Sequence, residues 1–150
     1  MSTQTFPIDA ALARFSEGYN CSQATLSAFA EALGLPLDTA LRLAVPFGGG
    51  IARQGEVCGA ASGALMALGL RYGSALPDKA AKERMYALAA EFLRRFEAAN
   101  GAIRCRDLIG FDTFTPEGQA AAREQRVFAS ICPHVVAAAI EIAAELLTRE

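Results

Sequence analysis

Several common cysteine and nucleotide motifs are missing from this sequence. No two of its four cysteines are separated by two residues, so it lacks the Cys-x-x-Cys unit of thioredoxin-like redox sites and zinc ribbons. The glycine loop at residues 48–50 is not followed by the Lys-Ser/Thr that completes a P-loop, which argues against a nucleotide site. A site built on the cysteines must therefore draw on residues far apart in the chain.

Charge and targeting signals are also sparse. The formal net charge is −2, and the charged residues, 20% of the chain, are dispersed rather than gathered into the basic face that nucleic acids require. The first residues lack the basic and apolar regions of a signal peptide. No apolar run approaches the ~20 residues needed to span a bilayer. We therefore expect a cytoplasmic protein with no nucleic-acid partner and no membrane span.

The hydrophobic pattern predicts an all-α fold. No stretch alternates apolar and polar residues over the length of a strand, and alanine, which favours helix, is abundant. At 150 residues a chain can bury roughly 68–70% of its unfolded surface, so it needs no covalent staple. We predict one compact, bundle-like helical domain over residues 1–150 with short connections. The 53% hydrophobic content also favours an apolar face that is buried in a homo-oligomer.

Start and stop signals divide this domain into helices. Asn20 and Gln23 have the spacing of a capping box, and Gly34 and Pro36 end the helix that follows. The helix after the glycine loop is apolar on all sides and is expected to lie at the centre. The predicted helices cover residues 7–17, 20–33, 38–45, 55–70, 78–99, 103–109, 115–131 and 133–147.

All four cysteines fall at or near predicted helix starts. They are Cys21, Cys58, Cys105 and Cys132. A helix N-terminus favours thiolate, but its dipole contributes only ~0.3–1 kcal/mol, well under one pKa unit. Four adjoining thiolates would therefore be unstable, and convergent sulfurs would be protonated, joined as disulfides or bound to a cationic centre. The alternative from spacing alone is four separate, buried core thiols.

Residues around the cysteines allow both functional and structural interpretations. Gly59 and Gly63 would let a bulky group or another backbone approach the central helix, although ordinary helix packing has the same requirement. Arg104 and Arg106 flank Cys105 and could lower its pKa or attract an anion, or simply be solvated. The single histidine, His134, could donate a proton or act as a ligand, or be solvated.

Taken together, these segments resemble the family of redox-active proteins named for its C-GCAxxG-C-C cysteine pattern. The matching pieces are residues 18–24, 47–50, 55–66, 105–110 and Cys132. One difference is the order Cys58-Gly59 where the family label has Gly before Cys, a shift of about 100° around a helix. The family is similar to split-Soret cytochromes c, which hold haems and an iron–sulfur site. Because this chain has no Cys-x-x-Cys-His unit, the resemblance implies no covalent haem but does imply a four-cysteine site.

Three functions compete on this basis. The first is an electron-transfer protein whose Cys21, Cys58, Cys105 and Cys132 ligate an iron–sulfur cluster, expected to be [2Fe–2S], with Gly59 beside it. The second is a thiol–disulfide oxidoreductase that needs no cofactor and cycles one or two cysteine pairs. The third is a structural zinc site or a helical interaction module. A redox partner protein is expected for the first two, and whether the protein is an enzyme stays open.

Overall fold

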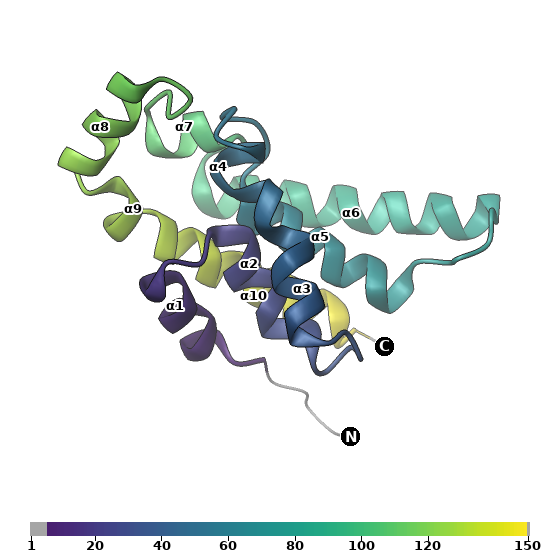
Figure 1. Cartoon of the computed structure of the whole chain (residues 1–150). Helices are drawn as coiled ribbons and strands as arrows, with labels where there is room; N and C mark the ends of the chain where they lie inside the picture. The colour runs from purple at the N-terminus through teal and green to yellow at the C-terminus, as the bar shows by residue number, and fades with distance from the viewer. Residues whose placement is uncertain (1–5, 150) are drawn as a thin grey trace.

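The computed structural model describes residues 6–149, and within this range it is all-α and contains no β-strand. The prediction of an all-α fold is confirmed. Figure 1 shows the arrangement of the helices. Their bounds are α1 Ile8–Glu17, α2 Cys21–Ala30, α3 Leu37–Ala44, the 3₁₀ helix η1 Val45–Phe47, α4 Gly48–Ile51, α5 Gly59–Tyr72, α6 Lys79–Asn100, α7 Cys105–Ile109, α8 Pro116–Glu124, α9 Val127–Ser130 and α10 Cys132–Leu147.

Local sequence signals account for several of these helix boundaries. The capping box is present: Asn20 Oδ1 accepts from the Gln23 N–H at 3.0 Å, and Gln23 Oε1 accepts from the Asn20 N–H at 2.9 Å. Gly101 ends α6 in the left-handed conformation, at φ 92°. The helix predicted over residues 115–131 is instead two helices, because Arg126 takes a left-handed φ of 57° between them.

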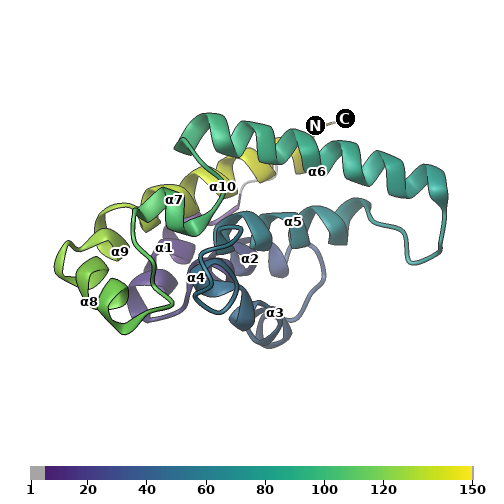
Figure 2. The same cartoon turned by 90° about the horizontal axis from the view of Figure 1, so that it is seen from above.

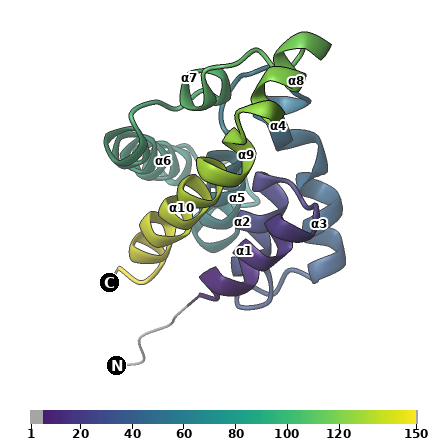
Figure 3. The ribbon, with the colours of Figure 1, turned by 90° about the vertical axis from the view of Figure 1, so that its left-hand side faces the viewer.

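The central helices are α2, α5 and α10, which all pack against one another. Viewed from above, α6 lies along α10 and α5 on one side, and α3 lies against α2 on the opposite side (Figure 2). The short helices α4, α7, α8 and α9 gather at one end of this bundle, as the view in Figure 3 also shows. The prediction that the helix after the glycine loop lies centrally is confirmed, although α5 begins at Gly59 rather than near residue 55.

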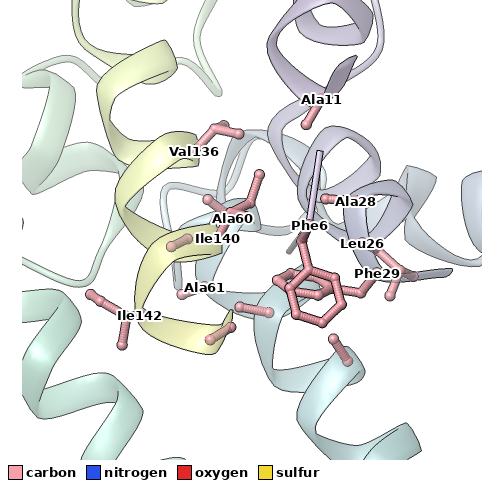
Figure 4. Packing of buried hydrophobic residues seen from close by; sticks show 14 of the residues in the cluster. Phe6, Ala11, Leu26, Ala28, Phe29, Ala60, Ala61, Val136, Ile140 and Ile142 are labelled. Carbon is pink, nitrogen blue, oxygen red and sulfur yellow. The ribbon is translucent and has the colours of Figure 1, made fainter. Parts of the chain in front are cut away.

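Alanine and glycine allow the central helices to approach closely. Ala60 and Ala61 of α5 lie between α10 and α2 in Figure 4, where the Phe6 and Phe29 rings pack with their centroids 4.6 Å apart. A Cβ added to Gly63 would lie 2.7 Å from the Ser22 carbonyl oxygen of α2. The predicted role of the Gly59 and Gly63 face as a contact surface for another helix is therefore confirmed.

The last helix corrects one sequence-based expectation. We expected no apolar run long enough to cross a bilayer, but the helical stretch Val127–Leu147 is long and apolar enough by length and composition. The side chains of Val136, Ile140 and Ala143 are fully buried in the main core. Packing of this kind gives a core helix the same apolar composition, so the stretch is weak evidence for a membrane span.

Candidate functional site

The four cysteines line one small cavity at the end of the bundle that carries the short helices. Cys21, Cys105 and Cys132 are the first residues of α2, α7 and α10, and Cys58 is the N-cap residue of α5. The rest of the lining is apolar and consists of Leu108, Ile109, Ile131 and Val135. Helix starts that are far apart in sequence thus bring all four thiols, none of which is in a disulfide, to one place.

Backbone hydrogen bonds fix the positions of Cys58 and Cys105 relative to each other. The Cys58 N–H donates to the Ile103 carbonyl at 2.9 Å, and the Cys105 N–H donates to the Glu56 carbonyl at 2.7 Å. Between these bonds, Val57 and Arg104 form an isolated antiparallel bridge. This short pairing joins the segment before α5 to the segment before α7, so both cysteines are held by paired backbone rather than by free loops.

A left-handed turn supports the same pair of segments. Five consecutive residues, 49–53, have φ between 51° and 71°, and three of them (Ile51, Ala52 and Arg53) are not glycine. Each non-glycine residue in this conformation costs roughly 1–2 kcal/mol. The glycines here are required by contact as well, since a Cβ on Gly50 would lie 2.7 Å from the Cys105 Cβ. The glycine loop is therefore a strained support that packs against the cysteine cavity.

Cys21 and Cys58 form a hydrogen-bonded thiol pair. The Cys58 thiol donates to Cys21, and with backbone N–H groups of Gly49, Ser22 and Ala60 it lowers the pKa of Cys21 to about 7 despite burial. The same bond, together with burial, raises the pKa of Cys58 well above its ordinary value. Cys21 is thus the thiol that ionises near neutral pH, and Cys58 keeps its proton.

The other two thiols are harder to ionise. Burial, as the larger cause, and the charge on Cys21 together raise the pKa of Cys105 to about 11. The same two causes, with the charge on Cys105, raise the pKa of Cys132 to about 12. The arginines beside Cys105 do not offset this rise. Arg104 pairs with Glu56 at 3.2 Å, and Arg106 donates to the Gln54 carbonyl at 3.0 Å. The idea that these arginines lower the pKa of Cys105 is therefore wrong.

His134 lies apart from the cysteine cavity. Although it is two residues beyond Cys132, its side chain is exposed and does not line the cavity. In the first turn of a helix, a step of two residues points the two side chains about 200° apart, which explains the separation. In the part of the chain that the structure describes, the four cysteines are thus the only titratable side chains of the cavity lining.

The cysteine cavity has the donor set of a metal centre but not its geometry. It offers about 20 Å³ for the centre of a water-sized group, enough for roughly one water molecule. Among residues 6–149, no group of three or more His, Cys, Asp or Glu side chains is arranged to hold a metal ion. Ligation of a metal ion would therefore require the sulfurs to move from their positions in this structure.

A second, larger cavity adjoins the cysteine cavity. Its volume is about 490 Å³, within the usual range for small-molecule sites, and Cys21, Cys105 and Cys132 lie in its wall. Among its other lining residues, Asn20 and the glycine loop were noted from the sequence, but as a helix cap and a loop rather than as a ligand site; the remainder come from separate segments and share no local motif. The lining residues besides the cysteines are Phe15, Asn20, Val45, Gly48, Gly49, Ala52, Arg53, Thr113, Gln119, Arg123 and Phe128.

Comparison with known proteins connects this arrangement to one family. The family model described as "Putative redox-active protein (C_GCAxxG_C_C)" matches residues 19–146, a span that includes all four cysteines. A relative from Archaeoglobus fulgidus, described as "Uncharacterized protein", is 30% identical in an alignment of 135 positions that covers 85% of this chain and 83% of the relative. No solved structure matches the chain.

Proposed function

Because the chain belongs to the C_GCAxxG_C_C family of redox-active proteins, we propose that its four cysteines together hold an iron–sulfur cluster, [2Fe–2S], that transfers electrons. The observation that supports this proposal is the shared cavity of Cys21, Cys58, Cys105 and Cys132. A dithiol site needs two sulfurs, whereas a cluster of this kind uses four. Four thiols from four helix starts are more than the dithiol chemistry requires.

The chemistry of the residues around the sulfurs suits such a cofactor, although the sulfurs would have to move to ligate it. When bound, the cluster would supply one-electron chemistry, and the cysteine thiolates would hold it. The apolar side chains of the lining limit access of water, and the N–H groups of Gly49, Ser22 and Ala60 would stabilise charge at the Cys21 sulfur. Both features act on the potential of a cluster. Gly59 leaves room beside Cys21 Sγ, which would lie 2.6 Å from an added Cβ.

The test of this proposal is anaerobic purification of the full chain. We expect a coloured protein with iron and acid-labile sulfide in equal amounts, and loss of the visible absorption when iron is removed by a chelator. A colourless, metal-free protein would contradict the cluster proposal. Zinc bound without a redox change would instead indicate a structural site.

The proposal has three further parts. We expect a redox partner protein, a homo-oligomeric state and a cytoplasmic location.

A second candidate function rests on the Cys21–Cys58 hydrogen bond. The Cys21 thiolate would attack a substrate disulfide and release one thiolate, and Cys58 would then attack the mixed disulfide and release the other. The substrate disulfide gains two electrons, and the site becomes a Cys21–Cys58 disulfide. Formation of the mixed disulfide removes the charge on Cys21, which is a cause of the high pKa of Cys58, and so makes Cys58 easier to ionise.

Alkylation of the reduced, metal-free protein tests the thiol pair. We expect iodoacetamide to modify Cys21 first, because Cys21 is the cysteine whose pKa is lowered, to about 7. The rate of its modification should therefore rise through a midpoint near pH 7. Cys105 should require pH near 11, the value to which its pKa is raised. Mass spectrometry of peptides labelled across pH measures both midpoints. Cys58→Ala, which removes the donor, should move the Cys21 midpoint upward, and an unchanged midpoint would contradict the hydrogen bond as its cause.

A further inference from the structure

The cavity of about 490 Å³ beside the cysteines has the composition of a site for an organic anion. Phe15, Val45 and Phe128 supply apolar wall, and Arg53 and Arg123 supply positive charge. Among residues 6–149, no aspartate or glutamate lines it, so the formal charge of these lining side chains, apart from the thiols, is +2. Within residues 6–149, neither arginine forms an ion pair, which leaves both guanidinium groups available to a ligand.

A left-handed backbone conformation places Arg53 in the same cavity wall as three of the cysteines. Arg53 is the last residue of the left-handed run and has φ 65°. Its side chain lies on Gly49, where an added Cβ would be 2.9 Å from Arg53 Cγ. The Gly49 N–H in turn bonds to Cys21. Strain of this kind is retained where the surrounding structure fixes a functional position. Here it holds a cation next to the backbone that contacts the most ionisable thiol.

We propose that this cavity binds a small organic carboxylate with an apolar body, whose carboxylate lies at Arg53 and Arg123. Guanidinium groups match the planar geometry of a carboxylate, and the phenylalanine rings cover an apolar body. A molecule bound there would touch Cys21, Cys105 and Cys132, three of the four sulfurs. The inference rests on the proposed redox function in one respect: the bound carboxylate would be a substrate or redox partner of the four-cysteine site.

Calorimetric titration with naphthalene-2-carboxylate and its neutral carboxamide tests the proposal on the full chain. We expect the carboxylate to bind, and the amide to bind at least about tenfold more weakly because it loses charge-assisted hydrogen bonds. Bound carboxylate should also slow the alkylation of Cys21. Equal affinity for acid and amide, the absence of binding, or binding without protection of Cys21 would each overturn the proposal.

Matched arginine variants locate the binding. Arg53→Gln and Arg123→Gln should each weaken carboxylate binding about tenfold. Arg84→Gln on α6 removes the same charge from an exposed residue outside the cavity and should leave affinity unchanged. Arg123 lies on helix α8, so its variant remains informative if the strained turn at Arg53 does not tolerate substitution. Equal affinities in all three variants would refute the site.

The failure of this inference can be distinguished from failure of the cluster proposal. Iron and sulfide are measured on the same samples, independently of the titration. Binding of the carboxylate by a colourless, iron-free protein supports the anion site and rejects the cluster. An iron-loaded protein that binds no carboxylate supports the cluster and rejects the anion site.

Discussion

Replacing Cys58 with serine is expected to remove bound iron and visible absorption from anaerobically purified protein, with its helical content unchanged. Cys58 is buried, with 6% of its surface exposed, and it shares the cavity with the other three thiols. A serine hydroxyl is a poor substitute for a thiolate on iron. Burial of the new hydroxyl should destabilise the fold by about 1–3 kcal/mol, which circular dichroism and thermal unfolding would detect.

The control for this variant is His134→Ala. His134 is close to Cys132 in sequence, but its exposed side chain is outside the cavity, so iron content and colour should match those of the unchanged protein. Retention of the full spectrum by Cys58→Ser would show that this sulfur is not a ligand. Loss of the spectrum in both variants would show instead that the site depends on residues beyond the cavity.

Alanine at Gly59 is expected to disturb both the packing of α5 and the cysteine site. The new Cβ would lie 2.6 Å from Cys21 Sγ and 2.8 Å from the Phe47 carbonyl oxygen. The thiol can move, but the carbonyl is backbone and cannot move without shifting η1. Overpacking of this kind typically costs 1–3 kcal/mol. We therefore expect a lower midpoint of chemical unfolding and a changed spectrum or iron content.

Two other glycines of the same helix separate packing from chemistry. Alanine at Gly63 meets the Ser22 carbonyl at 2.7 Å, so it should destabilise α5 against α2 without contacting a sulfur directly. Alanine at Gly69 meets no atom within 4 Å and should stabilise the helix by roughly 0.5–1 kcal/mol. If Gly59→Ala alters the site no more than Gly63→Ala does, the effect comes from helix packing alone.

The fold was predictable because its signals are local. Helical periodicity, the Asn20 capping box and the glycine stops act within a few residues, so they identified most helices and the central position of α5. The helix boundaries that were missed are those that have no local signal in the sequence. Arg126 and residues 51–53 adopt left-handed conformations that their side chains do not favour, and only tertiary contacts select them.

The gathering of the four cysteines was predictable, but the electrostatics of their cavity was not. Placing each cysteine at a helix start was enough to suggest one shared cavity. The pKa order was not available from the chain, because it depends on the contact between Cys21 and Cys58 and on the burial of Cys105. The roles of Arg104 and Arg53 likewise depend on what each side chain contacts in the folded chain: the Glu56 carboxylate for Arg104 and Gly49 for Arg53.

A second, smaller core connects two of the cysteines with the surface helices α7, α8 and α9. Ile109, Ala122 and Val127 form a cluster of their own, with Cys105 and Cys132 packed against it. So small a cluster stabilises α7, α8 and α9 little by itself, and we therefore expect this segment to unfold locally before the main core does. Binding of the proposed cluster would add bonds at Cys105 and Cys132, and we expect it to increase the order of this segment. Gain or loss of those bonds would tighten or loosen the outer face of α8, a change that a binding partner can sense without contacting a sulfur.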